Sequence, residues 1–173
     1  MRVYQSAFFA VVVCLAALPA RAQDAAQIEI TPYLAIGSAG ASPVGTAITV
    51  PITSTLALET DVAYRRGEGN IHALSTSASL LWFLPRVGRA TPYAAAGIGL
   101  SQFGAPVSFA PGGQPVGTQK SLTATVNAGG GIKMAVSEKV DMRTDARWFK
   151  SFGRYGSEQF RVAQGLSFDV GRR

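Results

Sequence analysis

The fold is decided by residues 140–150, VDMRTDARWFK. Apolar or small side chains at Val140, Met142, Thr144, Ala146 and Trp148 alternate with Asp141, Arg143, Asp145, Arg147 and Phe149. A repeat of two places successive side chains on opposite faces of an extended strand, whereas a helix repeats at 3.6. The stretch therefore predicts a β-strand with one apolar face and one strongly charged face.

The same alternation recurs in seven other segments, with turn-forming residues between them. The predicted strands are Ile28–Ile36, Thr46–Ile52, Leu56–Arg65, Ile71–Phe83, Tyr93–Phe103, Ser121–Met134, Val140–Lys150 and Glu158–Val170. Connections after the second, fourth and sixth strands are short or bounded by proline, and the others are polar and rich in glycine. Outer-membrane barrels alternate short periplasmic turns with longer external loops in this order. We predict an all-β fold, an eight-stranded antiparallel up-and-down transmembrane β-barrel.

The N-terminal segment predicts export. Arg2 supplies a positive start, Ala7 to Leu18 is a short apolar run, and Ala20-Arg21-Ala22 has the form of a signal-peptide cleavage site. We expect residues 1–22 to be a cleaved signal peptide and residues 23–173 to be the barrel domain. Export and a spanning barrel together predict the outer membrane of a Gram-negative bacterium.

Composition excludes several classes of function. The net charge is +6, and it falls to +4 when Arg2 and Arg21 leave with the signal peptide. This modest excess does not predict nucleic-acid binding. Cys14 is the only cysteine and lies in the signal, so the mature chain has neither disulfide nor thiolate chemistry. The sequence also offers no His and Cys cluster for a metal and no cofactor motif.

Charged residues gather on the polar face of the predicted strands. They are Glu59, Asp61, Arg65, Lys133, Asp141, Arg143, Asp145, Arg147 and Arg161. Strands three and seven lie opposite each other in an eight-stranded ring, whose interior is only wide enough for side chains to fill. Acids and bases from opposing walls can therefore pair across the lumen. We predict an interior charge network that plugs the barrel, in preference to an open pore or a catalytic site.

Aromatic residues fall near the predicted strand ends, where membrane barrels carry interfacial girdles. They are Tyr33, Tyr64, Trp82, Tyr93, Phe103, Trp148, Phe160 and Phe168. The alternative is that they are ordinary aromatics of a barrel core. We assign Tyr64, Trp82, Trp148, Phe160 and Phe168 to the lipid interface.

The sequence gives little support for catalysis. His72 is the only histidine, and Ser75 and Ser77 follow it closely, so a Ser–His hydrolase at the barrel rim is conceivable. The simpler interpretation is an exposed histidine beside a loop. We predict that the protein is not an enzyme.

Residues Ser101 to Gln119 form the longest predicted loop, which is rich in Gly and Pro. The loop carries apolar side chains with which a ligand could make contact, at Phe103, Val107 and Phe109. Loops of this length are often functional. We expect this loop to be the contact surface for an extracellular ligand, with an unselective loop as the alternative.

Three stretches resemble one protein family. They are Ile30–Leu34 (ITPYL), Thr91–Gly99 (TPYAAAGIG), and Gly129–Lys133 (GGGIK) leading to Asp141–Phe149 (DMRTDARWF). In these the chain resembles the small outer-membrane β-barrels, including the barrel of outer-membrane protein A and the opacity-type surface proteins. The resemblance implies contact with outer-membrane lipid and lipopolysaccharide and insertion by the barrel-insertion machinery. Family members include structural proteins, adhesins, resistance factors and a few lipid-modifying enzymes.

Two other readings remain open. In a soluble periplasmic barrel of lipocalin-like shape, the apolar face would line a ligand cavity and the charged face would meet water. An outer-leaflet lipid A-modifying enzyme would rest on His72 and a rim serine alone.

Overall fold

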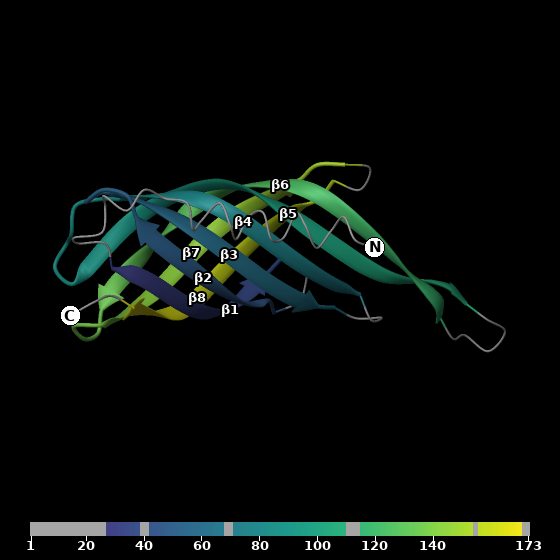
Figure 1. The fold of residues 1–173 in the computed structure, drawn as a ribbon, viewed down its shortest axis with the longest axis horizontal. Helices are drawn as coiled ribbons and strands as arrows, with labels where there is room; N and C mark the ends of the chain where they lie inside the picture. Colours follow the sequence, from purple (N-terminus) through teal and green to yellow (C-terminus); the bar gives the residue numbers. More distant parts are fainter. Residues whose placement is uncertain (1–26, 39–41, 68–70, 110–114, 154–155, 171–173) are drawn as a thin grey trace.

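The computed structural model describes residues 27–38, 42–67, 71–109, 115–153 and 156–170. They form eight strands: β1 Ile28–Gly37, β2 Val44–Pro51, β3 Leu56–Arg66, β4 His72–Phe83, β5 Ala90–Phe109, β6 Pro115–Ala135, β7 Val140–Ser151 and β8 Glu158–Val170. Each strand pairs antiparallel with the next, and β8 pairs with β1 to close the barrel (Figure 1). This confirms the predicted eight-stranded barrel. The predicted signal peptide lies outside the described residues.

The two ends of the barrel differ in their connections. The β2–β3, β4–β5 and β6–β7 turns lie at one end, together with the start of β1 and the end of β8; we call this the turn end. These turns close on backbone hydrogen bonds such as Ile52 N to Leu56 O at 2.8 Å and Val136 N to Val140 O at 3.0 Å. The opposite end is the loop end. No helix within the described residues is long and apolar enough to cross a membrane.

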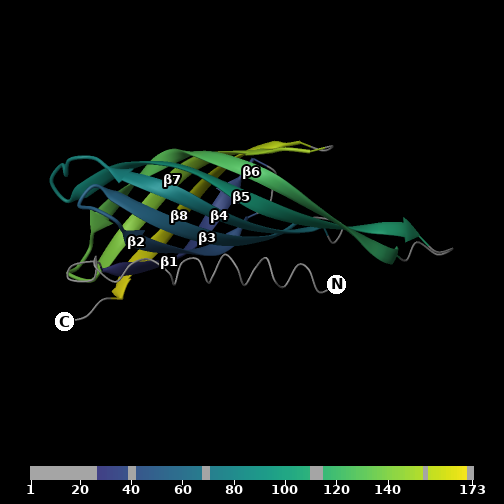
Figure 2. The same cartoon turned by 45° about the horizontal axis from the view of Figure 1, so that its top comes forward.

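Strands β5 and β6 are longer than the sequence predicted. Most of the expected 101–119 loop belongs to these strands, which run on together beyond the barrel as a two-stranded ribbon (Figures 1 and 2). The loop prediction is therefore wrong for residues 101–109 and 115–119, and residues 110–114 lie outside the described part. Pro106 pairs with Thr118 where β5 no longer has β4 beside it. An edge position tolerates proline because the missing N–H has no partner strand to serve.

The seam between β1 and β8 accommodates another proline. Register pairs run from Ile28 to Ile30 and resume at Tyr33, so Thr31 and Pro32 have no backbone partners on β8. Proline cannot donate to the ladder, which accounts for the gap. The hydroxyl oxygens of Thr31 and Ser167 share a hydrogen bond of 2.7 Å across the same place. Side chains thus replace part of the missing backbone pairing.

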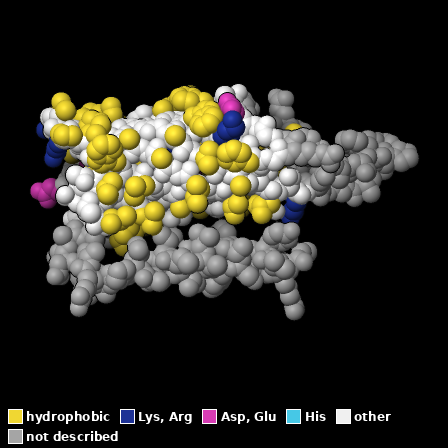
Figure 3. Space-filling model, turned by 90° about the horizontal axis from the view of Figure 1, so that it is seen from above, with side chains coloured by type: hydrophobic (Ala, Val, Ile, Leu, Met, Phe, Trp, Pro, Cys, Tyr) yellow, Lys and Arg dark blue, Asp and Glu magenta, His cyan; other side chains and the backbone are white. Residues whose placement is uncertain are grey.

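The two faces of the wall have opposite character. Apolar side chains point outward and stay exposed, as at Leu34 (69 %) and Ile98 (70 %), and they spread over the outer wall (Figure 3). Charged outward-facing side chains of the described strands occur only at the loop end: Arg66, Lys120, Lys150 and Glu158. The lipocalin-like alternative required the apolar set to point inward, so this arrangement contradicts it.

Candidate functional site: the charged lumen

Two arginines of β7 cross the lumen to one carboxylate of β3. Arg147, which is fully buried, places Nη2 2.6 Å from Glu59 Oε1, and Arg143 Nη1 pairs with Glu59 Oε2. Asp145 Oδ2 accepts from Nη2 of Arg143 at 3.1 Å and from Nη2 of Arg147 at 3.0 Å. With Tyr93, these four residues form what we call the Glu59 cluster. Its two acids balance its two bases.

Neutral groups add further hydrogen bonds to this cluster. Thr49 donates to Glu59 at 3.2 Å, and Ser79 accepts from Arg147 at 3.4 Å. Tyr93 accepts from Arg143 Nε at 2.7 Å and donates to Asp145 at 3.2 Å. The Arg143 guanidinium also lies 4.9 Å from the centre of the Tyr93 ring. Buried charges are tolerated only when partners replace their hydration, and these contacts supply partners for all the charged atoms except Asp145 Oδ1 and Arg147 Nε, which are buried without one.

A second cluster repeats this chemistry on other strands. Tyr33 donates to Asp61 Oδ2 at 2.5 Å, and Arg161 Nη1 donates to the Tyr33 hydroxyl at 2.8 Å and to Asp61 Oδ1 at 3.2 Å. The Arg161 guanidinium also lies 5.0 Å from the Tyr33 ring and 4.8 Å from the Phe149 ring. We call Asp61, Tyr33, Arg161 and Phe149 the Asp61 cluster. The Tyr33 and Phe149 rings therefore both stabilise the Arg161 guanidinium by cation–π contact.

Glycines make room for the two lumenal tyrosines. Gly45 and Gly165 are the register partners of Tyr33 on β2 and β8, and Gly131 is the partner of Tyr93 on β6. A Cβ at Gly45 or Gly131 would overlap the neighbouring tyrosine side chain. Glycine in a strand often marks such a close approach. The rings can therefore lie flat against the wall and leave the centre to the arginines.

A third cluster lies at the turn end. Lys133 Nζ is 2.5 Å from Glu29 Oε1 and 3.2 Å from Asp141 Oδ2, and it lies 5.7 Å from the centre of the Phe83 ring. We call these four residues the Lys133 cluster. Glu29 is absent from our predicted set, although it shares the inward face of its strand with Thr31 and Tyr33. That parity was the signal that could have identified it.

The nine predicted charges thus separate into three clusters and one residue apart. No hydrogen bond or ion pair within the described ranges joins one cluster to another. Arg65 stands apart: its Nη1 donates to Gln159 Oε1 at 3.3 Å, and it forms no ion pair with a described carboxylate. The lumen therefore holds separate local clusters in place of one continuous network.

The predicted aromatics divide between the two faces. Tyr64, Trp82, Trp148, Phe160 and Phe168 all lie exposed on the outer wall. Tyr33 and Tyr93 are instead buried in the lumen, so grouping them with interfacial aromatics was wrong. Their parity with Thr31 and Thr91 already placed them on the polar face. Phe103 is half-buried and pairs with lumenal Ala73.

The structure does not assemble the conceivable Ser–His pair. Alternation along β4 puts His72 on the outer face and Ser75 and Ser77 on the inner face. The Ser75 hydroxyl shares a 2.9 Å hydrogen bond with Ser101, and the His72 ring lies over Gly104. Opposite faces of one strand keep base and nucleophile apart. Among the described residues, no three His, Cys, Asp or Glu side chains are placed to hold a metal.

Comparison with solved structures identifies the fold class. The chain superposes on the N-terminal barrel domain of Pseudomonas aeruginosa OprF with a TM-score of 0.64 at 17 % identity, over 84 % of this chain and 100 % of that one. Neisserial surface protein A gives 0.62 at 15 % identity, over 84 % and 96 %. The outer membrane enzyme PagL gives 0.51 at 16 % identity, over 82 % and 99 %.

These likenesses show that the chain has the eight-stranded fold of outer-membrane β-barrels. No protein-family model matches the sequence. No curated protein matches it either. Because one fold hosts many functions, the function must be argued from the site.

Proposed function

We propose that this protein spans the outer membrane of a Gram-negative bacterium as a sealed barrel with a structural or surface-contact role. The observation that carries the proposal is the contrast between the two faces of the wall. The outward face is apolar between the strand ends, as lipid contact requires, and the inward face holds charges that are paired across the lumen. On this proposal, residues 1–22 direct export, and the barrel-insertion machinery completes assembly.

The Glu59 cluster supplies the seal. Its side chains from β3 and β7 meet in the lumen, and neither Glu59 nor Arg147 is appreciably exposed. An ion moving along the axis would have to separate Glu59 from two arginines. That separation leaves buried charges unpaired, at a cost of about 3–5 kcal/mol. We therefore propose a closed lumen in place of a steady pore.

A bilayer recording tests the seal. The purified full chain, inserted in a planar bilayer, should show no steady open-pore conductance. Glu59→Ala should raise the frequency of openings, because Arg143 and Arg147 then lose their shared partner. Lys150→Gln, on the outer wall, is the matched control and should behave as the unmodified protein. A steady conductance from the unmodified protein would contradict the seal.

The loop-end collar supports contact with lipopolysaccharide. On the described strands, the outward-facing cations Arg66, Lys120 and Lys150 outnumber the acid Glu158, which bridges Lys150 at 3.2 Å. Cations at the loop end can bind the phosphate groups of lipopolysaccharide in the outer leaflet, because charge-assisted hydrogen bonds to phosphate are strong. Substituting Arg66 and Lys120 by Gln should reduce co-purification of lipopolysaccharide. Substituting Lys139 at the turn end by Gln should not change it.

The β5–β6 ribbon is the proposed contact surface for an extracellular ligand. β4 accompanies β5 only to Gly104, and β7 accompanies β6 only to Thr125, so no strand of the described residues lies along either outer edge of the ribbon. Free strand edges can accept an added strand. Deleting residues 105–115 should leave barrel folding intact and abolish any adhesion that the full chain confers. Adhesion that survives the deletion would exclude the ribbon as the contact surface.

A further inference from the structure

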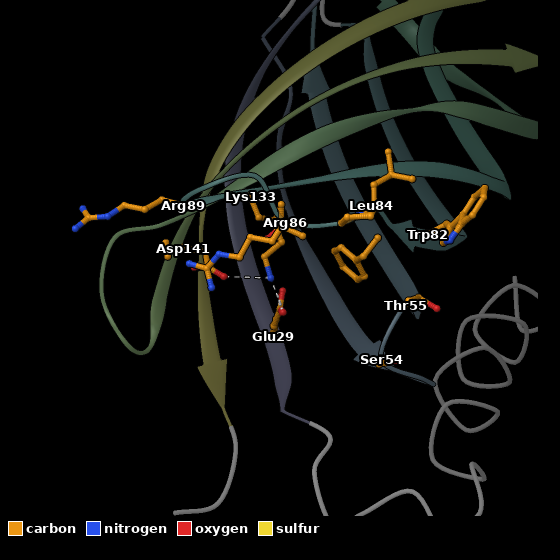
Figure 4. Close-up of a pocket in the computed structure, with 13 residues that line it drawn as sticks. Glu29, Ser54, Thr55, Trp82, Leu84, Arg86, Arg89, Lys133 and Asp141 are labelled. Atoms are coloured by element: carbon orange, nitrogen blue, oxygen red, sulfur yellow. Dashed lines mark hydrogen bonds and ion pairs between the residues drawn. The ribbon is translucent and has the colours of Figure 1, made fainter.

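A cavity of about 610 Å³ opens at the turn end, and its lining combines charges of both signs. The Lys133 cluster forms its lumenal side, and the β2–β3 and β4–β5 turns form its rim (Figure 4). Arg86 and Arg89 of the β4–β5 turn contribute guanidinium groups to that rim. None of these groups contributes to the seal around Glu59. The cavity is therefore a separate candidate site.

The lumenal side of the cavity favours a cation. Lys133 is held by Glu29 and Asp141, and the second oxygen of Glu29, Oε2, is buried without a hydrogen-bond partner. Asp169 is the register partner of Glu29 on β8 and adds a third carboxylate to this region. Two acids thus pair with one lysine, and a third lies opposite Glu29 on β8. The Glu29 and Asp141 side chains are partly exposed beside the cavity, and their two negative charges exceed the one positive charge of Lys133, which favours a second cation.

The rim of the cavity favours an anion. Arg86 uses Nε to donate to Gly88 O at 2.9 Å, so its two terminal nitrogens remain available. No described carboxylate lies within ion-pair distance of Arg86 or Arg89. In Figure 4, Arg86 extends toward the Lys133 cluster, whereas Arg89 points away from it. Arg86 is thus the rim cation best placed to hold a phosphate, because guanidinium matches phosphate geometry.

Apolar side chains continue from the rim onto the outer wall. Trp82 and Leu84 line the cavity and also expose 57 % and 41 % of their surfaces. They belong to the outward, apolar face of the wall. A molecule with its polar end in the cavity could therefore lay a hydrocarbon chain along these side chains. The carboxylates, the arginine and the apolar side chains thus follow one another in the same order as the ammonium, the phosphate and the acyl chain of a zwitterionic phospholipid.

We propose that this cavity binds the phosphoethanolamine headgroup of a phospholipid in the periplasmic leaflet. The phosphate binds Arg86, the primary ammonium donates to the partly exposed carboxylates of Glu29 and Asp141, and an acyl chain follows Trp82 and Leu84. The inference rests on the proposed outer-membrane location. A headgroup without a cation would leave the excess negative charge of Glu29 and Asp141 unbalanced, and a quaternary ammonium has no N–H to donate to either carboxylate.

Native mass spectrometry of the full chain in detergent tests the headgroup. Phosphatidylethanolamine, phosphatidylglycerol and phosphatidylcholine with identical acyl chains are the probes. We expect phosphatidylethanolamine to bind about tenfold more tightly than either of the others, which corresponds to about 1.4 kcal/mol. Soluble phosphoethanolamine should compete only weakly, because it lacks the acyl chain. Strong competition by the soluble compound would contradict a lipid as the occupant, and equal binding of all three lipids would overturn the site.

Substitutions assign the two halves of the headgroup. Arg86→Gln should weaken both phosphatidylethanolamine and phosphatidylglycerol about tenfold, whereas Glu29→Gln should remove the preference between them. Lys139→Gln, at the same end but outside the cavity lining, is the control and should change neither. Unchanged binding by a folded Arg86→Gln protein, with its β-sheet content checked by circular dichroism, would overturn the proposal.

Asp141→Asn is a second variant that tests the contact with the headgroup ammonium, and it is used if Glu29→Gln does not fold. It should lower the preference for phosphatidylethanolamine, and an unchanged preference would count against the proposal. Because the assay runs in detergent, its failure is distinct from a failure of the outer-membrane proposal. Cell fractionation tests the latter separately.

Discussion

The Glu59 and Asp61 clusters use the same three groups in different surroundings. Each contains a lumenal tyrosine, an aspartate that accepts from it, and an arginine that donates to the tyrosine hydroxyl and to the aspartate. In the Asp61 cluster the unit stands nearly alone, and two aromatic rings flank Arg161. In the Glu59 cluster the unit shares its aspartate with a second arginine, and both arginines share Glu59.

The difference lies in how many partners depend on one carboxylate. Removing Glu59 would leave two buried guanidiniums with Asp145 as their only acid. Removing Asp61 would leave one guanidinium that still has the Tyr33 hydroxyl and two rings. We infer that the unit of tyrosine, aspartate and arginine adds modest stability where it stands alone, in the Asp61 cluster. In the Glu59 cluster, where Arg147 joins it, the side chains stabilise one another cooperatively and seal the lumen.

The largest effect is expected from Glu59→Leu. Two buried arginines lose their shared partner, so the free energy of unfolding should fall by about 3–5 kcal/mol. Urea unfolding of the protein in lipid vesicles, followed by tryptophan fluorescence, measures it. Glu59→Gln keeps the shape and the acceptor oxygen, and it should lose less. A loss below about 1 kcal/mol for Glu59→Leu would show that the cluster is not cooperative.

Asp61→Leu should destabilise the barrel less than Glu59→Leu. Arg161 loses its one ion-paired hydrogen bond, to Asp61, but keeps the Tyr33 and Phe149 rings, so we expect about 2–3 kcal/mol. The same urea experiment measures this change. Should Asp61→Leu prove as damaging as Glu59→Leu, the distinction between the clusters would fail.

Removing the two tyrosine hydroxyls tests whether the clusters are independent. Tyr33→Phe and Tyr93→Phe should each cost about 1 kcal/mol, because each removes hydrogen bonds inside one cluster. Since the clusters share no hydrogen-bond or ion-pair partner, the double variant should equal the sum within about 0.5 kcal/mol. A coupling above about 1 kcal/mol would mean that the clusters act as one network.

The smallest effect is expected at Arg65. It donates to Gln159 at 3.3 Å and belongs to neither cluster, so Arg65→Gln should change the free energy of unfolding by less than about 0.5 kcal/mol. The variant also serves as the control for the three experiments above. A loss of unfolding free energy comparable to that of Asp61→Leu would show that Arg65 does belong to the charge network that the sequence predicted.

The sequence predicted the strands and their faces well, since both follow from a period of two. The last strand, Glu158–Val170, begins and ends as predicted. The sequence did not predict the length of β5 and β6, because their Gly and Pro residues indicate a loop when pairing is unknown. Pro106 is acceptable only because β4 has already ended at that level. Strand length there depends on tertiary context and not on local composition.

The charged residues of the lumen could be predicted, but their pairing could not. Parity puts Glu59, Asp61, Arg143 and Arg147 on the inward face. It does not indicate that Glu59 pairs with both arginines while Asp61 pairs with Arg161, because the register of the strands and the available space decide which long side chains meet. Gly45, Gly131 and Gly165 provide part of that space by letting tyrosines lie against the wall. Glycines in these positions become informative only after the register is known.

The central claim is that the apolar outer face meets lipid and the charged face is the sealed lumen. Fractionation of cells that express the full chain tests it most directly, with outer membranes separated on a density gradient. The account predicts that the protein sediments with the outer membrane and is released only by detergent. Recovery in the soluble periplasmic fraction without detergent would contradict it.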